Sequence, residues 1–383
     1  MFKLLRGGHC FSPDNIGKKD VLTIYNKIYR VEESIKPDIL PDIEIIDCRG
    51  CIICPSFIDQ HVHIIGGGGE EGPISRIPEL MLGDIISAGI STVVGVLGVD
   101  DVSRNMESLL AKARGLEEEG VNTFIYTGSY AVPTRTITGS VKSDIILIDK
   151  IIGAGEIAIA DHRSSYPTIN QLAELASEIN VGGLIGKKAG VMHIHVGDGK
   201  DGIGLLYQIV NNYDFPIKMF VPTHLNRTAT LLEEAVEYLC VGGNADLTAG
   251  ENSSKGISVP EALSTLLKKN LDMQKVTVSS DGNGSIPAEG GKGTGVGLVK
   301  QLYEDIRNSI INEDVEMSKA ISAVTSNVAK VLGMYPKKGA IAAGSDADIL
   351  VLESGSLRIK ELIVKGERLM GDGIVLKKGR YEK

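Results

Sequence analysis

The segment FIDQHVH, from Phe57 to His63, places two histidines one residue apart at the end of an apolar run. Side chains alternate between the two faces of a strand, so His61 and His63 are expected on the same face, where their imidazoles could bind one metal ion. A strand edge that carries two polar side chains would give the same short pattern. Further ligands elsewhere in the chain therefore decide between a metal site and a simple strand edge.

The region around this segment, residues 55–334, alternates short β-branched runs with amphipathic segments of helical period. Such alternation is typical of repeated βα units and a parallel sheet. Eight strands are predicted, in the segments SFIDQHV, STVVGVLG, NTFIYTGSY, GEIAIAD, GVMHIHVG, IKMFVPTH, NADLTAG and KVTVSSD. This pattern predicts an α/β fold of the TIM (β/α)8 barrel type, in which functional side chains lie at the carboxyl ends of the strands.

The two ends of the chain differ from this central region. Residues 1–54 and 335–383 contain short strand-like runs that are separated by turn residues. Neither end is long enough for an independent core. We therefore expect both ends to pair as one small β domain beside a barrel of residues 55–334.

Composition restricts the class of protein. The 383 residues are 43% hydrophobic and 23% charged, with a formal net charge of -9. These values are typical of a soluble globular chain, and the negative balance argues against a nucleic-acid partner. No apolar run is long enough for a membrane span, and the N-terminal segment becomes polar too early for a signal peptide. A cytoplasmic protein with no membrane partner is expected.

The five cysteines include the motif CRGCIIC, which contains Cys48, Cys51 and Cys54. An odd number of cysteines in a long chain is typical of reduced thiols in the cytosol. The C-x2-C-x2-C spacing could also hold an iron–sulfur cluster, but Cys10 and Cys240 are distant in the sequence and no fourth cysteine is nearby. We favour the interpretation that CIICPSFID is a strand that enters the core.

Side chains that can bind metal occur on five of the eight predicted strands or directly after them. They are His61, His63, Glu156, His195, His224 and Asp281. Neutral imidazoles and carboxylates suit zinc and related divalent ions, and one carboxylate can bridge two ions. If the strands form a barrel, all six groups share one rim. The alternative is a set of unrelated core or edge polar residues.

These segments together resemble the amidohydrolase superfamily, and within it the isoaspartyl dipeptidases. The similarity covers essentially the whole chain. The H-x-H pair and the closing segment KKGAIAAGSDADILVL are general to the superfamily, whereas GGGGE, DHRS, THLNR and SDGNGS are specific to the isoaspartyl dipeptidases. Such enzymes cleave dipeptides whose aspartate is linked through its β-carboxyl. The resemblance implies a metal-dependent hydrolase of small dipeptides, with two divalent ions per chain, expected to be zinc, and a homo-oligomeric assembly.

Glu156 departs from the family pattern at the metal site. In the better-known members a carboxylated lysine on the fourth strand bridges the two metals, whereas this sequence has Glu156 there. The glutamate carboxylate lies about three bonds closer to its backbone than a lysine carbamate, so the strand or the ions must shift. We expect Glu156 to bridge two ions without carbon dioxide. A single-metal site and a salt-bridged Glu156 without metal are the alternatives.

The resemblance gives catalytic roles to Asp281 and Tyr130. Divalent ions acidify a water, and Asp281 would take its proton and deliver it to the leaving amine. Tyr130 would donate a hydrogen bond to the developing oxyanion. A buried tyrosine with a satisfied hydroxyl is the alternative for Tyr130.

Six residues are implied as the substrate-binding set: Glu70, Gly68, Val99, Arg163, Arg227 and Ser285. Each arginine can pair with a carboxylate through two hydrogen bonds, and Glu70 can bind the free α-ammonium group. The glycines from Gly66 to Gly69 would let the backbone approach the ligand. Val99 stands where the best-known relatives have a threonine, so one hydroxyl contact is expected to be absent.

Two further histidines are expected outside the ligand set. His193 shares a strand face with His195, and we expect it deeper in the barrel. His162, inside DHRSS, is expected to be a structural partner rather than a ligand.

Two other functions remain open from the sequence. Another hydrolase of the superfamily, of the dihydroorotase, hydantoinase or N-acyl-amino-acid type, would share the metal ligands but not Glu70, Arg163 and Arg227 as a set. A non-catalytic binding protein with an amidohydrolase fold would be expected to lose metal ligands, which this chain retains.

Overall fold

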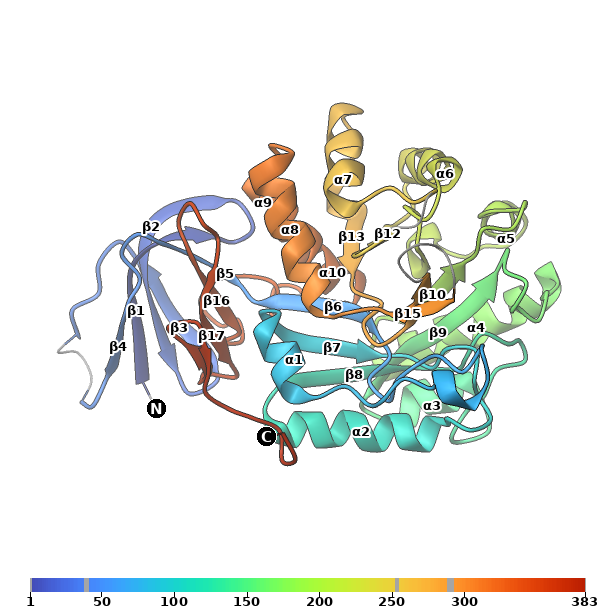
Figure 1. Ribbon diagram of the computed structural model, residues 1–383, viewed down its shortest axis with the longest axis horizontal. Helices are drawn as coiled ribbons and strands as arrows, with labels where there is room; N and C mark the ends of the chain where they lie inside the picture. The colour runs from blue at the N-terminus through green and yellow to red at the C-terminus, as the bar shows by residue number, and fades with distance from the viewer. Residues whose placement is uncertain (1, 38–40, 252–254, 288–292, 383) are drawn as a thin grey trace.

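A computed structural model describes residues 2–37, 41–251, 255–287 and 293–382 of the chain. Two assemblies of strands lie side by side in it, a mixed sheet at one end and a curled parallel sheet with its helices at the other (Figure 1).

The parallel strands follow one another in space in the order of the sequence. Six of them form one sheet, namely β6 (Phe57–Val62), β7 (Ile90–Gly95), β8 (Asn122–Thr127), β9 (Ile151–Ile159), β10 (Val191–Val196) and β11 (Phe220–Thr223). Two more, β12 (Ala245–Thr248) and β13 (Val276–Ser279), pair with each other in parallel. Each of the eight predicted segments overlaps one of these strands, and β7 and β9 begin before their predicted segments.

Closure into an eight-stranded barrel is only partial in the hydrogen bonds of the described residues. Between β11 and β12 the contact is a single backbone hydrogen bond from Leu225 N to Asp246 O, 3.2 Å long. Between β13 and β6 it is an isolated parallel bridge that joins Val62 and Gly282. The structure therefore shows a curled parallel sheet of six strands and a neighbouring pair.

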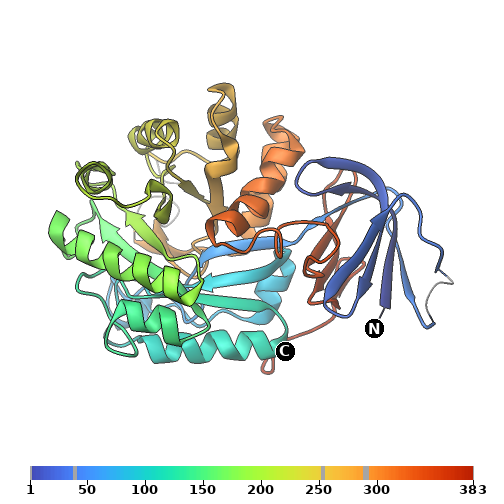
Figure 2. The same cartoon turned by 180° about the vertical axis from the view of Figure 1, so that it is seen from behind.

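Helices cover the outer side of these strands, and Figure 2 shows them from behind. The helices are α1 (Leu82–Ser87), α2 (Met106–Glu119), α3 (Val141–Leu147), α4 (Ile169–Gly186), α5 (Gly204–Asn212), α6 (Ala229–Cys240), α7 (Val259–Lys268), α8 (Lys300–Asn312), α9 (Met317–Ala323) and α10 (Ser326–Val331). Helices α2, α4, α6 and α7 lie in amphipathic segments between the predicted strands, as the alternating pattern predicted. Thr168 starts α4 with a capping box, in which its side chain and that of Gln171 each bond the other's backbone N–H.

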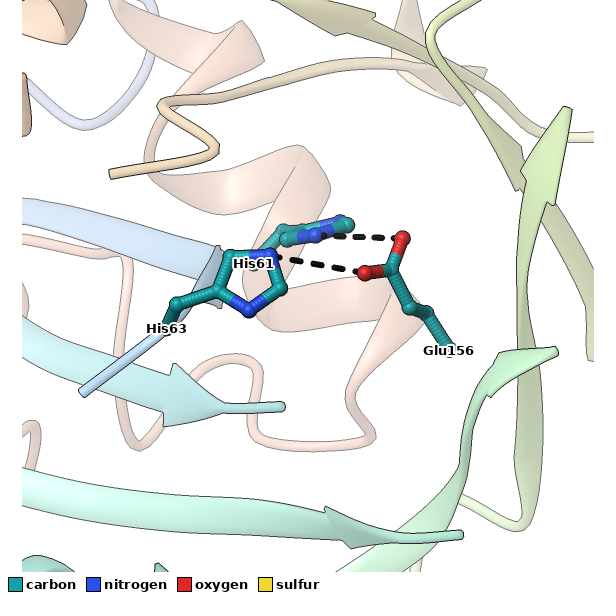
Figure 3. Close-up of side chains that lie close together, drawn as sticks. All are labelled: His61, His63 and Glu156. Atoms are coloured by element: carbon teal, nitrogen blue, oxygen red, sulfur yellow. Dashed lines mark ion pairs between the residues drawn. The ribbon is translucent and has the colours of Figure 1, made fainter. Parts of the chain in front are cut away.

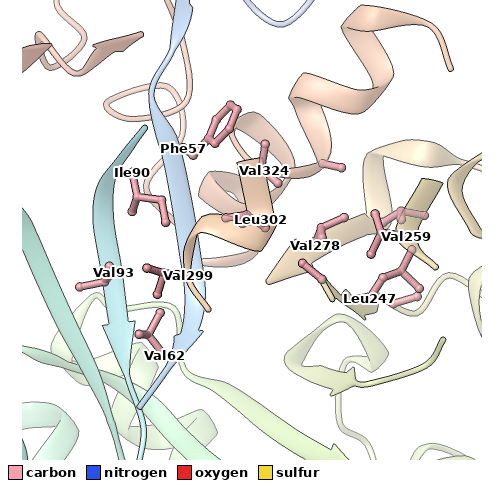
Figure 4. Packing of buried hydrophobic residues seen from close by; sticks show 14 of the residues in the cluster. Phe57, Val62, Ile90, Val93, Leu247, Val259, Val278, Val299, Leu302 and Val324 are labelled. Atoms are coloured by element: carbon pink, nitrogen blue, oxygen red, sulfur yellow. The ribbon is translucent and has the colours of Figure 1, made fainter. Parts of the chain in front are cut away.

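A continuous apolar core joins the strands to the helices. In Figure 4, Phe57 and Val62 of β6 lie near Val299, Leu302 and Val324, which follow the last parallel strand in the sequence. This packing holds the first strand beside the last segments of the parallel region.

Strands from both ends of the chain form the second sheet. It contains β1 (Phe2–Phe11), β2 (Asn15–Ile24), β3 (Lys27–Glu32), β4 (Glu44–Asp47), β5 (Cys51–Pro55), β16 (Ile349–Glu353), β17 (Ile359–Val364), β18 (Glu367–Gly371) and β19 (Ile374–Val375). The two ends meet where β5 pairs antiparallel with β16, from Cys51 opposite Glu353 to Pro55 opposite Ile349. A short hairpin, β14 (Ser285–Pro287) with β15 (Thr294–Val296), lies outside both assemblies.

The sequence suggested that the run CIICPSFID forms one strand, but the structure shows two. It divides at Ser56 into β5 of the mixed sheet and β6 of the parallel sheet. Pro55 explains the break, because it has no N–H group to continue a hydrogen-bond ladder.

Among the described residues, no helix has the length and apolar character needed to cross a membrane.

Candidate metal centre and substrate pocket

The first two histidines lie beside the end of β6 and face the same group of carboxylates. Nε2 of His61 is 3.4 Å from Oδ1 of Asp281, and Nε2 of His63 is 3.1 Å from the same oxygen. The ladder between β6 and β7 is irregular between Asp59 and Val62. This irregularity breaks the strict alternation of side chains. His61 and His63 nevertheless meet, as their spacing predicted.

Glu156, on β9, lies opposite both histidines and is 1% exposed. Its Oε1 is 3.4 Å from Nε2 of His63, and its Oε2 is 3.4 Å from Nε2 of His61, as the dashed lines in Figure 3 show. The two oxygens of one carboxylate are thus directed at two different imidazoles.

The same carboxylate also faces a second pair of histidines. Its Oε2 lies 3.0 Å from Nδ1 of His195, at the end of β10, and 3.6 Å from Nε2 of His224, which follows β11. Glu156 therefore lies between the pair from β6 and the pair from β10 and β11. The six predicted metal ligands converge at one rim, the carboxyl ends of the parallel strands.

The donor set fits divalent metal ions. Three triplets offer ligand atoms within 4.8 Å of one another: His61 with His63 and Glu156, His61 with His224 and Asp281, and Glu156 with His195 and His224. In the described part of the chain, Nε2 of His61 and Oε1 of Glu156 are buried without a hydrogen-bond partner. Buried polar atoms are normally paired, and imidazole nitrogen with carboxylate oxygen is a donor set that suits zinc.

The positive charges and hydrogen bonds inside this cluster keep its carboxylates ionised. Burial opposes ionisation of Glu156, but the positive charge of His61 and hydrogen bonds from the surrounding histidines hold its pKa well below the ordinary value. Burial likewise opposes ionisation of Asp281, and its bond to His63 keeps its pKa low. Burial would lower the pKa of His61, yet Glu156 and Asp281 raise it to about 9. A cation bound here would replace the proton on His61.

Local backbone geometry places two of the rim residues. His224 has φ 65° and Asp281 has φ 50°, in the left-handed region that residues other than glycine rarely adopt. The N–H of His63 donates to the carbonyl of Gly282 over 2.9 Å, which holds the Asp281 turn beside the first strand. Strained backbone of this kind is concentrated at functional sites.

Neighbouring side chains support the histidines from behind. Nδ1 of His61 lies 2.8 Å from Nε2 of His193, whose ring stacks on Tyr126. Nδ1 of His224 lies 2.7 Å from the hydroxyl of Thr248. His193 thus lies behind the cluster, where it was expected. His162 has an 83% exposed side chain and lies outside the cluster, with its Nδ1 3.5 Å from Oδ1 of Asp161.

Three buried aspartates at the rim or beneath it were not identified from the sequence. Asp246 accepts hydrogen bonds from Gln60 and three hydroxyl groups inside the strands. Asp59 accepts from the N–H groups of His61 and Ser280, and burial raises its pKa to about 7. These two side chains tie the strands together beneath the rim.

The third aspartate, Asp161, contacts the rim itself. His195 donates from Nε2 to Oδ2 of Asp161 over 2.9 Å, and Arg163 donates from Nη2 to the same oxygen over 2.8 Å. Burial opposes ionisation of Asp161, but these hydrogen bonds hold its pKa well below the ordinary value. Its place directly after β9 and its presence in DHRSS were the signals that could have identified it.

Tyr130 lies over the second pair of histidines. Its hydroxyl is 2.9 Å from Nδ1 of His195, and the side chain is 7% exposed. Burial and the negative charge of Glu156 raise its pKa well above the ordinary value. The hydroxyl therefore keeps its proton and can donate a hydrogen bond.

A pocket at the rim contains all of the predicted substrate-binding residues. Its lining includes Gly68, Glu70, Val99, Arg163, Arg227 and Ser285, together with His63, Tyr130, His195 and Asp281. The hydroxyl of Ser285 donates to Oε1 of Glu70 over 2.7 Å, and Nη1 of Arg163 is 3.2 Å from the same oxygen. Opposite charges thus face one another across the pocket before any ligand is bound.

The glycines of the GGGG segment serve the loop itself. A Cβ on Gly66 would collide with the carbonyl of Ile77, and one on Gly68 would collide with the carbonyl of Ser75. Both glycines also have positive φ, 77° and 74°. The absence of side chains at these two positions is needed for the fold of this loop.

A cavity of about 650 Å³ lies elsewhere, at the amino ends of the parallel strands, where Val191, Met219 and Lys275 contribute to its lining. No member of the histidine and carboxylate cluster lines it. The chemistry of the molecule therefore points to the smaller pocket at the rim.

Comparisons with known proteins agree with this geometry. Residues 52–369 match the amidohydrolase family. The crystal structure of a beta-aspartyl dipeptidase from Fervidobacterium islandicum AW-1, in complex with beta-Asp-Leu dipeptide, is 43% identical, with 100% of both chains covered and a TM-score of 0.92. A dihydropyrimidinase from Brevibacillus agri NCHU1002 shares the fold, with 16% identity, 99% and 97% coverage and a TM-score of 0.68.

An imidazolonepropionase from Colwellia psychrerythraea is 22% identical over 339 residues, which is 80% of this chain and 77% of the relative. The match to the family model and the 43% identity over full length show the family to which the sequence motifs pointed. This chain belongs to the amidohydrolase family, and within it to the family of the beta-aspartyl dipeptidases.

Proposed function

We propose that this chain hydrolyses dipeptides in which aspartate is linked through its β-carboxyl group. The observation that carries the proposal is the pocket in which Glu70, Arg163 and Arg227 adjoin the histidine and carboxylate cluster. The 43% identical structure, whose complex contains beta-Asp-Leu dipeptide, supports the same substrate class.

We further propose that this cluster holds two divalent ions, zinc in the cell. His61, His63 and Asp281 would hold one, and His195 and His224 the other, with Glu156 shared. When bound, such ions lower the pKa of a water molecule and polarise a carbonyl group. Two ions are favoured over one because the cluster offers six ligand side chains, more than the four ligands that one zinc ion usually binds.

Asp281 is proposed to move the proton in the reaction. Its carboxylate is ionised in the cluster and lies at the wall of the pocket, 5% exposed. It can therefore take a proton from the attacking water and return it to the leaving amine. Tyr130, which keeps its proton, would donate to the oxygen that gains negative charge.

The charged side chains of the pocket are proposed to bind the two ends of the dipeptide. An isoaspartyl dipeptide has one free ammonium and two free carboxylates. Glu70 would bind the ammonium, and Arg163 and Arg227 would each bind a carboxylate. Substrate binding would then exchange the contact between Glu70 and Arg163 for contacts with the ligand.

We also propose that the eight parallel strands act as one closed barrel of residues 55–334, with the two chain ends as a separate small β domain. The sequential order of β6 to β11, the parallel pair β12 and β13, and the bridge from Val62 to Gly282 support this architecture.

A second candidate function is hydrolysis of another amide, including cyclic amides. The imidazolonepropionase that matches 80% of this chain favours it, although its identity of 22% is low. Such a substrate would use the metal cluster but would not need all three charged pocket residues.

The deciding experiment compares turnover of β-aspartyl-leucine with that of α-aspartyl-leucine, using protein whose bound zinc, manganese and cobalt are quantified. Selective cleavage of the β-linked dipeptide with two ions per chain is the expected result. Removal of the ions by a chelator should abolish turnover, and addition of zinc should restore it. If fully metal-loaded protein does not cleave the β-linked dipeptide, the substrate is another amide.

A further inference from the structure

Asp161 lies between a predicted metal ligand and a predicted substrate-binding residue. It follows β9 by two residues and is 6% exposed. Its Oδ2 accepts hydrogen bonds from Nε2 of His195 over 2.9 Å and from Nη2 of Arg163 over 2.8 Å. Its Oδ1 accepts from the backbone N–H of Arg163 over 2.8 Å and from Nε of the same residue over 3.0 Å. One carboxylate thus accepts four hydrogen bonds.

An ionised carboxylate can only accept hydrogen bonds, so the contact with Asp161 favours a proton on Nε2 of His195. Nδ1 of His195 faces the cluster, 3.0 Å from Oε2 of Glu156 and 3.0 Å from Nε2 of His224. An imidazole nitrogen can bind a metal ion only when it carries no proton. A proton on Nε2, donated to Asp161, leaves Nδ1 free for a metal.

Other neighbours favour the opposite arrangement. Nη1 of Arg227 is 3.3 Å and Nη2 of Arg163 is 3.4 Å from Nε2 of His195. Guanidinium groups only donate hydrogen bonds, so they favour a proton-free Nε2 and would move the proton to Nδ1. Asp161 provides the acceptor that opposes this shift.

We propose that Asp161 is a positioning residue, which fixes His195 in the tautomer that binds metal through Nδ1 and, with the same carboxylate, holds Arg163 ready for a substrate carboxylate. The inference rests on the proposed metal-dependent function. It connects assembly of the metal centre to recognition of the substrate through one side chain.

An amide cannot replace this carboxylate. Asparagine has one accepting oxygen and one donating NH2 group. If the NH2 group replaces Oδ2, it faces the donors of His195 and Arg163. If it replaces Oδ1, it faces two donors of Arg163. Asp161→Asn should therefore disturb one of the two partners in either orientation.

The test measures metal retention and kinetics in Asp161→Asn. Titration of the zinc-loaded protein with a chelator, followed by elemental analysis, should show one of the two ions lost at a chelator concentration about 10- to 100-fold lower than in the wild type. With β-aspartyl-leucine as substrate, added zinc should restore much of kcat, whereas KM should stay raised because Arg163 is no longer held.

Asp348→Asn is the matched control. Asp348 is also 6% exposed, and it accepts hydrogen bonds from Asn122 over 3.0 Å, Lys338 over 2.6 Å and the backbone N–H of Lys365 over 2.7 Å. It resembles Asp161 in burial and in having a cationic partner, but it touches no histidine of the cluster. Its variant should keep both ions and the wild-type KM.

The outcomes separate this inference from the proposed function. If the wild type binds no divalent ion, both are wrong. If the wild type holds two ions and Asp161→Asn keeps both with unchanged resistance to the chelator, only the role of Asp161 is wrong. Equal losses in Asp161→Asn and Asp348→Asn would also overturn that role. Asp161→Ala, which removes the acceptor without adding an NH2 group, is measured in the same way if the asparagine variant does not fold.

Discussion

Two motifs with the spacing of metal ligands lie close together in this chain, the cysteine motif at residues 48–54 and the histidine pair at residues 61–63, and their environments in the structure differ. Cys51 and Cys54 lie on β5, three positions apart, and pack into different apolar clusters. His61 and His63 lie two positions apart beside the end of β6 and face the same carboxylates. Among the described residues, the triplets able to bind metal include no cysteine.

The difference shows that the spacing of ligand residues predicts a metal site only when the secondary structure is known. On a strand, an interval of three places two side chains on opposite faces, and an interval of two places them on one face. Position in the fold adds the second requirement. β5 is covered on both sides by apolar residues, whereas β6 ends at a rim that receives side chains from several other strands.

The largest expected effect is at the histidine rim, in Asp281→Asn. Loss of the group that transfers the proton should lower kcat about 10²- to 10⁴-fold, because this is the usual contribution of general acid–base catalysis. The amide still offers an oxygen to a metal, so metal content should stay near that of the wild type. Steady-state kinetics and elemental analysis of the same preparation measure both. A variant that keeps more than a tenth of wild-type kcat would contradict the role of Asp281.

Glu70→Gln should have a smaller effect, limited to recognition at the rim. A charge-assisted hydrogen bond contributes about 1.5–3 kcal/mol, so kcat/KM for β-aspartyl-leucine should fall about tenfold to a hundredfold. An N-acetylated substrate lacks the ammonium group and should be affected much less. Ser285→Ala is the control, because it removes a partner of Glu70 but keeps the charge. Equal losses for both substrates would exclude Glu70 as the ammonium-binding residue.

In the cysteine motif, Cys54→Ser should change stability without changing metal content or kcat. Cys54 is fully buried, and a serine hydroxyl there would cost about 1–3 kcal/mol of the free energy of unfolding. Urea denaturation measures this loss. Cys240→Ser, at an exposed position, should change stability by less than about 0.5 kcal/mol. Loss of bound metal in Cys54→Ser would show that the cysteine motif contributes to a metal site after all.

The eight parallel strands could be predicted because each combines a β-branched run with turn residues and a following amphipathic helix. The six rim residues followed, since the carboxyl ends of such strands lie together. To predict that these residues meet around Glu156, only the order of the strands had to be correct.

Other features were beyond the sequence because they depend on contacts between distant segments. Asp246 accepts hydrogen bonds from Gln60 and Thr277, which are far from it in the chain. The strand break at Ser56 arises because the residues before it pair with the mixed sheet and those after it pair with the parallel sheet.

The smallest expected effect on activity comes from alkylation of the native protein. Burial raises the pKa of the Cys10 and Cys48 thiols to about 12, so at pH 8 only about one molecule in 10⁴ carries a reactive thiolate at either position. Iodoacetamide should therefore modify the exposed Cys240 and leave turnover and metal content unchanged, as intact mass and kinetic measurements can show.

The same pKa shifts make the free energy of unfolding depend on pH. The unfolded chain loses its thiol protons near pH 8.5, whereas the folded chain keeps those of Cys10 and Cys48 up to about pH 12. Between these limits the unfolded state binds fewer protons, so the free energy of unfolding falls as pH rises. Cys10→Ala should make that fall less steep in urea denaturation at pH 8 to 10. An unchanged slope would mean that the Cys10 thiol is not buried as the structure shows.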